Sequence, residues 1–233
     1  MSNYYQLPHR VRHSIYRLTS PRSFRRHQAE RLSIEGRFHC FDQASAIYIH
    51  IAKCGGTSIA KTLFNVEKVS HRTVRDYQKI FSPEDFNRYY KFTFVRNPWS
   101  RMLSAYSFLM GGGGTEQDIK FTEHYLRPYK DFADFVHCGV NEKVLAKHWF
   151  KPQRDYICLP KQDTPLVDKI YRLESATDDI LHACEKLQLV PRALPVLNTS
   201  KHDHYLNIYD NSSAAIVAQI YARDIELLNY QFY

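Results

Sequence analysis

The chain has 233 residues, of which 44% are hydrophobic, and carries a formal net charge of +8. No apolar run approaches the roughly 18 residues that a membrane-spanning helix needs, and the N-terminus lacks a signal-peptide core. The five cysteines are scattered and form no CxxC pair, which argues against a disulfide framework and a zinc site and favours the reducing cytoplasm.

The first forty residues are strongly basic. Eight arginines face only two acids there, Glu30 and Glu35. The arginines are Arg10, Arg12, Arg17, Arg22, Arg25, Arg26, Arg31 and Arg37. We therefore expect a basic extension over residues 1–45 and a single domain over 46–233. The extension could contact nucleic acid, a membrane surface or an acidic glycan, or simply be solvated or packed. Nucleic acid is not expected, because no recognised binding module surrounds the arginines.

Residues 46–60 predict a buried strand, a tight glycine turn and the start of a helix. Isoleucines at 47, 49 and 51 alternate with larger polar or aromatic residues, as in a strand. Gly55 and Gly56 would let backbone N–H groups approach an anion, with Thr57 and Ser58 capping the helix. Lys53 adds a full positive charge. Because this lysine precedes the glycines, the loop differs from the nucleotide-binding pattern of kinases.

Residues 90–106 predict a second strand followed by a helix. Phe92, Phe94 and Val95 favour the strand, Arg96 lies where it ends, and Pro98 suits the first turn of a helix running to Met110.

Together, the two stretches resemble the PAPS-dependent sulfotransferases, in particular the family that contains the Golgi carbohydrate sulfotransferases and their bacterial relatives. The resemblance implies an α/β fold with a central parallel sheet flanked by helices, similar to the P-loop nucleotide kinases. It also implies 3′-phosphoadenosine-5′-phosphosulfate (PAPS) as cofactor and no metal. Residues at matching positions are Lys53, Cys54, Gly55, Gly56, Thr57 and Ser58 for the 5′-phosphosulfate, and Arg96 and Ser104 for the 3′-phosphate. Ala52 stands where the family usually has proline.

His71 is the candidate catalytic base. We expect a short strand ending at Val69 and a helix over 73–80, which would put His71 in a loop at the carboxyl edge of the sheet. The resembled family often has its base in this region. A loop histidine can equally be a solvated side chain.

Residues 147–160 resemble a segment of the chondroitin and dermatan type carbohydrate sulfotransferases. His148, Trp149, Gln153 and Arg154 offer an aromatic ring and polar groups that suit a sugar. Trp149 as a core anchor is the alternative. Before this segment, Ser82 begins a capped helix, and four glycines at 111–114 form a hinge or a connector.

The last third predicts another central strand over 168–174. A helix follows from Ser175 to Leu187, with a capping box between Ser175 and Asp178. The loop at 198–202 is similar to one that closes over the cofactor in the family, which makes Lys201 a candidate phosphate contact. One amphipathic helix is expected over 212–228.

These features predict in-line transfer of a sulfuryl group to a hydroxyl, most simply on a glycan. A histidine would take the proton of the acceptor, and Lys53 would neutralise charge on the leaving phosphate. The alternatives are a P-loop kinase or NTPase, which would need Lys-Ser/Thr after the glycines and a magnesium ligand, and a non-catalytic polyanion-binding module. The oligomeric state is left open.

Overall fold

The computed structural model describes residues 4–67, 69–190 and 205–233. These residues form two compact units, which are described separately. The first, called the sheet unit, comprises residues 4–51, 55–95 and 155–190. The second, called the helical unit, comprises residues 52–54, 96–154 and 205–233.

The sheet unit contains a three-stranded parallel sheet in the order β1-β2-β3. Its strands are β1 (Ala46–Ile49), β2 (Tyr90–Val95) and β3 (Lys169–Arg172). Ala46 pairs with Tyr90, and Phe92 pairs with Lys169. The predicted α/β class with a central parallel sheet is confirmed.

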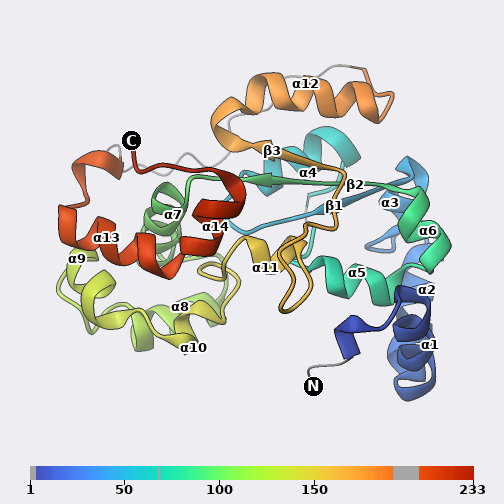
Figure 1. Cartoon of the computed structure of the whole chain (residues 1–233), viewed down its shortest axis with the longest axis horizontal. Helices are drawn as coiled ribbons and strands as arrows, with labels where there is room; N and C mark the ends of the chain where they lie inside the picture. Colours follow the sequence, from blue (N-terminus) through green and yellow to red (C-terminus); the bar gives the residue numbers. More distant parts are fainter. Residues whose placement is uncertain (1–3, 68, 191–204) are drawn as a thin grey trace. The chain divides into compact units, whose positions relative to one another are not determined.

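Helices surround this sheet. Figure 1 shows α4 and α12 on one side of the strands and α5 on the other. The helices of the unit are α1 (His9–Thr19), α2 (Pro21–Leu32), α3 (His39–Ala44), α4 (Gly56–Phe64), α5 (Val74–Ile80), α6 (Pro83–Arg88) and α12 (Ala176–Lys186). Short 3₁₀ turns lie at Tyr4–Gln6 and Leu173–Ser175.

One face of the sheet is aromatic, because side chains alternate along each strand. Tyr48 of β1 stacks on Phe92 of β2 with ring centroids 5.2 Å apart, and Phe94 stacks on Tyr171 of β3 at 4.9 Å. Phe64 at the end of α4 packs against Tyr48. Each such pair contributes about 0.5–1.5 kcal/mol beyond the area that it buries, so this face holds the strands and α4 together.

The helical unit has a separate apolar core. Trp99, Leu103, Phe135 and Phe150 are buried in it. The indole Nε1 of Trp99 donates to the carbonyl of Ala214 at 2.8 Å. Its elements are α7 (Pro98–Met110), α8 (Glu116–Tyr125), α9 (Phe132–Asp134), a π-helical turn (Phe135–Gly139), α10 (Glu142–Leu145), a 3₁₀ turn (Tyr205–Asn207), α13 (Asn211–Ile220) and α14 (Ala222–Leu228). The short helix α11 (Arg154–Ile157) starts where the chain leaves this unit.

Several predicted helix starts are confirmed. Asn97 caps α7 by accepting from the N–H groups of Trp99 and Ser100, and Pro98 occupies the first turn. Ser82 caps α6 by accepting from Asp85. The glycines at 111–114 end α7, and two of them, Gly112 and Gly113, have positive φ.

Three predictions about elements are wrong. No strand occurs in the described residues leading to Val69, whose carbonyl oxygen accepts a hydrogen bond from the His50 ring and not from a neighbouring strand. The capping box at Ser175 does not form, because the Ser175 hydroxyl donates to Asp179 instead, at 2.8 Å. The single helix expected over 212–228 is interrupted at Tyr221, which separates α13 from α14.

The predicted boundary at residue 45 stays a prediction. Residues before it form α1, α2 and α3, and the described part of them belongs to the sheet unit. Across the described chain, no helix combines the length and the apolar character needed to cross a membrane.

Candidate active site

The glycine turn after β1 leads into helix α4, whose amino-terminal end has no side-chain cap. Gly55 is the N-cap of α4 with φ of 72°, and no side chain caps the helix. The prediction that Thr57 and Ser58 cap it is wrong, because both lie inside the first turn; Thr57 is exposed and Ser58 buried. The first N–H groups of a helix have no partner within it, and the helix dipole favours negative charge there. The turn therefore offers backbone donors to an anion.

Gly56 is packed against an imidazole. A Cβ atom at this position would lie only 1.7 Å from Nε2 of His50, so glycine is required. His50 is buried, and its Nδ1 lies 2.8 Å from the carbonyl oxygen of Val69. Because a carbonyl only accepts, Nδ1 carries the proton. His50 thus joins the glycine turn to the segment before His71. His50 was not among the site residues predicted from the sequence, although a polar side chain directly after a buried strand can indicate a functional site.

The exposed His71 ring lies against His50. The two ring centroids are 4.2 Å apart, with the rings tilted by 47°. The expected strand before His71 is absent, so its position depends on the His50 contact and on α5, whose N-cap is Thr73. This pair places two imidazoles beside the glycine turn of the sheet unit.

The helical unit holds three cations close together: Lys53, Arg96 and Arg101, called here the cation cluster. Lys53 has a left-handed backbone with φ of 66°, and its Nζ lies 4.1 Å from the centroid of the Phe108 ring. Burial, followed by repulsion from Arg96 and Arg101, lowers the pKa of Lys53 to about 8. An anion bound beside this lysine would stabilise its charged form and raise its pKa again.

Hydrogen bonds fix the two arginines of the cation cluster. Nε of Arg96 donates to the Ser100 hydroxyl at 3.0 Å, and its guanidinium reaches the Lys53 carbonyl at 3.4 Å. Arg101 is buried, and its Nε donates to the Ala52 carbonyl at 2.9 Å. The guanidinium of Arg101 therefore braces the loop that carries Lys53.

Gln153 holds the backbone of Arg96 at both polar groups. Its side-chain oxygen accepts from the Arg96 N–H at 2.9 Å, and its amide nitrogen donates to the Arg96 carbonyl at 2.7 Å. The thiol of Cys54 donates to the same Gln153 oxygen at 3.4 Å. Asp224 accepts from the backbone N–H groups of Gln153 and Arg154, at 2.7 and 2.8 Å. Gln153 thus connects the cation cluster to α14.

The other predicted site residues of the helical unit lie at different depths. Trp149 is buried in the core, where its ring packs on Phe121. His148 is half-buried, and burial lowers the pKa of its imidazole. Ser104 is buried on α7. Lys201 lies outside the described residues.

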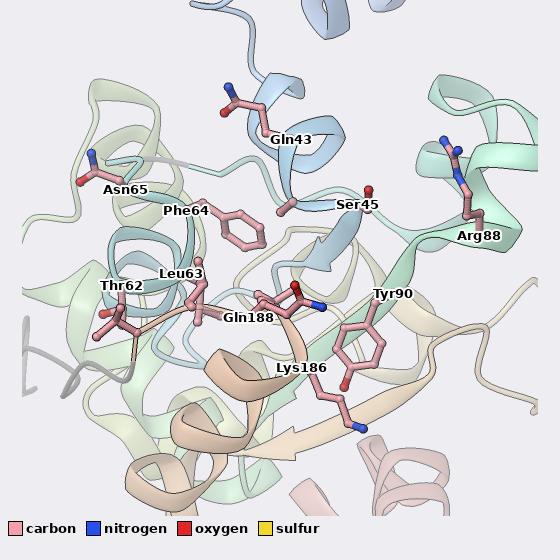
Figure 2. Close-up of a pocket in the computed structure, with 14 residues that line it drawn as sticks. Gln43, Ser45, Thr62, Leu63, Phe64, Asn65, Arg88, Tyr90, Lys186 and Gln188 are labelled. Atoms are coloured by element: carbon pink, nitrogen blue, oxygen red, sulfur yellow. The ribbon is translucent and has the colours of Figure 1, made fainter.

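A pocket of about 700 Å³ lies at the opposite, amino-terminal edge of the sheet (Figure 2). Ser45 directly precedes β1 and Tyr90 opens β2, while Asn65 and Lys186 mark the carboxyl ends of α4 and α12. None of the predicted site residues lines this pocket. Ligands of parallel sheets bind at the carboxyl edge, so the pocket is not the candidate phosphate site.

Among the described residues, no group of three or more His, Cys, Asp and Glu side chains could hold a metal ion. Comparisons with curated proteins and with solved structures found no match. A model of the sulfotransferase family matches residues 37–231, a range that includes the glycine turn, both histidines beside it and the whole cation cluster. The chain therefore belongs to the sulfotransferase family.

Proposed function

We propose that this chain transfers a sulfuryl group from PAPS to a hydroxyl group of a carbohydrate. Membership of the sulfotransferase family supports sulfuryl transfer in general. The observation that carries the cofactor assignment is the cation cluster, in which a half-buried lysine with a lowered pKa lies beside a hydrogen-bonded Arg96. Such a cluster suits a ligand with several anionic groups.

The residues present fit a sulfonucleotide. The uncapped first turn of α4 suits the 5′-phosphosulfate, and Gly56 leaves room in that turn for the His50 ring. Only Cys54 separates Lys53 from Gly55 in the chain, so the lysine belongs to the same loop. Arg96 and Ser104 are assigned to the 3′-phosphate. A role for Lys201 in closing over the cofactor remains part of the proposal.

Two side chains are assigned to the chemistry. When bound, PAPS supplies the sulfuryl group and a phosphate that leaves. Lys53 stabilises negative charge developing at that phosphate, an interaction that strengthens toward the transition state. His71 accepts the proton of the acceptor hydroxyl, which is otherwise a poor nucleophile. Its contact with His50 orients the ring.

His148 is assigned to the acceptor. It is the half-buried member of a set whose other members are held in place. The core holds Trp149, the Arg96 backbone holds the Gln153 side chain, and Asp224 holds the backbone of Arg154. An imidazole next to a tryptophan suits a sugar hydroxyl and its C–H face. We propose that the other three position His148 and shape the acceptor site.

A cytoplasmic location is part of the proposal. All five cysteines are free thiols, which persist in a reducing compartment.

The test is incubation of the purified chain with radiolabelled PAPS and a panel of glycans, phenols and lipids. The expected result is label on a glycan with release of 3′-phosphoadenosine 5′-phosphate, without added metal. Transfer only to phenols or lipids would contradict the carbohydrate assignment. Absence of transfer, together with magnesium-dependent ATP turnover, would contradict PAPS as the donor.

A further inference from the structure

The basic amino-terminal residues form a helical hairpin, with α1 and α2 joined at Ser20 and lying side by side (Figure 1). Its inner side is fixed to the rest of the sheet unit. Nε2 of His9 lies 2.6 Å from the Gln78 carbonyl, and Gln28 donates to the Ile80 carbonyl at 3.0 Å. The hairpin is therefore packed as part of the sheet unit, and its outer side is exposed and available for contacts.

Each helix presents one solvent-exposed stripe, and the two are called here the outer stripes. Their residues recur at helical spacing, three, four and seven positions apart. On α1 the stripe consists of Arg10, Val11, Ser14, Arg17 and Leu18, and on α2 of Arg22, Arg25, Arg26, Ala29 and Leu32. The outer stripes thus carry five arginines and no carboxylate.

Four of the five arginines are not explained by the stability of the hairpin. Arg17 is the exception, because its Cζ lies 5.8 Å from the centroid of the Phe24 ring and it stands in the last turn of α1. Within the described residues, no carboxylate forms an ion pair with the five arginines of the outer stripes. The neighbouring acid Glu30 pairs with Arg37 instead, and Glu35 follows the end of α2. Both helices lack an acid in the first turn. Arg22 lies in the first turn of α2, where the helix dipole disfavours positive charge. This charge points to an external anionic partner.

Exposed aliphatic side chains identify the kind of partner. Leu18 is 79% exposed, Leu32 82% and Ile34 85%, and they lie on or directly after the outer stripes. A nucleic acid or a soluble glycan would leave these side chains in water. A bilayer takes both kinds of group, because guanidinium groups bind anionic headgroups while leucine and isoleucine enter the boundary with the acyl chains.

We propose that the outer stripes dock the protein on a membrane surface rich in anionic phospholipid. The arrangement of arginines beside exposed aliphatic residues matches peripheral helices that lie in the plane of the interface. This docking is separate from the proposed chemistry, because no residue of the outer stripes is assigned to the candidate active site.

The experiment is co-sedimentation of the full chain with vesicles of phosphatidylcholine alone or mixed with phosphatidylserine. Binding is expected only to the mixed vesicles, and it should weaken as salt is added. Combined Arg22→Gln, Arg25→Gln and Arg26→Gln changes should reduce the vesicle affinity about a hundredfold, since each arginine at an anionic surface contributes roughly fivefold.

The matched charge control combines Lys130→Gln, Lys143→Gln and Lys161→Gln, which removes three exposed cations elsewhere and should leave binding nearly unchanged. Leu18→Ser with Leu32→Ser should also weaken binding, whereas Ile119→Ser with Leu181→Ser, at exposed sites on other helices, should not. Unchanged melting temperatures establish that each variant is folded.

Absence of binding to the mixed vesicles would overturn the proposal, as would equal losses in the arginine and lysine triple variants. Binding to heparin or DNA that survives the leucine substitutions, with no vesicle binding, would instead identify a soluble polyanion as the partner and also overturn it.

Discussion

The glycine turn of the sheet unit and the cation cluster of the helical unit offer different means of recognising an anion. In the sheet unit, the glycine turn offers backbone N–H groups at the uncapped start of α4. In the helical unit, the cation cluster offers side-chain charges: the Ala52 carbonyl holds the Arg101 guanidinium, and Gln153 holds the backbone of Arg96. Truncating a side chain cannot remove a backbone N–H donor, whereas it does remove a charge of the cation cluster. The glycine turn is therefore tested by adding a side chain that would clash, and the cation cluster by truncating its side chains.

The largest expected effect belongs to the imidazole of the sheet unit. His71→Ala should lower kcat by about 10²–10⁴, the usual contribution of a general base, with little change in nucleotide affinity. In the unchanged protein, activity should be lost at acid pH, where an imidazole is protonated and cannot accept a proton. Steady-state kinetics with PAPS and a labelled acceptor give both quantities.

His148→Ala is the matched comparison in the helical unit. It should raise KM for the acceptor with a smaller effect on kcat. The reverse pattern would assign the base to His148, and near-normal turnover in both variants would remove both histidines from that role.

The next largest effect concerns Lys53 of the cation cluster. Lys53→Ala should lower kcat by roughly 10²–10³, as for loss of one transition-state donor, and should change the nucleotide Kd less. Lys61→Ala, which removes an exposed lysine of α4, is the control and should leave both values near normal. Normal turnover of Lys53→Ala at saturating PAPS would show that the lysine only binds.

A steric change tests the glycine turn. Gly56→Ala should destabilise the protein by roughly 1–3 kcal/mol, because its Cβ would overlap the buried His50 ring. Thermal unfolding and nucleotide titration measure the effect. Gly114→Ala is the control, since its Cβ would meet only ordinary contacts of 3.6 Å and beyond. Adding His50→Ala to Gly56→Ala should restore part of the stability, and no recovery would mean that His50 is not the obstacle.

The smallest effect is a pH dependence of nucleotide binding. Free Lys53 loses its proton as pH rises through about 8, whereas a bound anion raises its pKa. The affinity should therefore be constant below pH 8 and fall up to tenfold per pH unit above it. Lys53→Ala should flatten this dependence. A fall of the same size in Lys53→Ala would assign the titration to another group.

The sequence predicted the features that depend on local chemistry. Pro98 marks the first turn of α7, and alternation along Phe92 and Phe94 identifies β2; both follow from nearest neighbours in the chain. The parallel order of the sheet also agrees with strands separated by helices.

Contacts between distant segments could not be predicted in this way. The strand expected before His71 has suitable side chains, but the bond from His50 to Val69, nineteen positions along the chain, holds that segment differently. Likewise, the polar side chain of Gln153 suggested a sugar ligand, yet in the fold it binds both backbone groups of Arg96. The role of an amide or imidazole side chain depends on the residue that it contacts in the fold, and the local sequence does not identify that residue.

The most direct test of PAPS dependence compares two nucleotides that differ in the 3′-phosphate, using calorimetric titration of the unchanged protein and of Arg96→Ala. The unchanged protein should bind 3′-phosphoadenosine 5′-phosphate. Arg96→Ala should weaken that binding by about 1.5–3 kcal/mol, roughly ten- to a hundredfold, because a charge-assisted contact is lost. Affinity for adenosine 5′-phosphosulfate, which lacks the 3′-phosphate, should hardly change. The control Arg127→Ala, at an exposed arginine that pairs with Glu123, should affect neither nucleotide. Equal losses for both nucleotides, or no binding of either by the unchanged protein, would contradict the account.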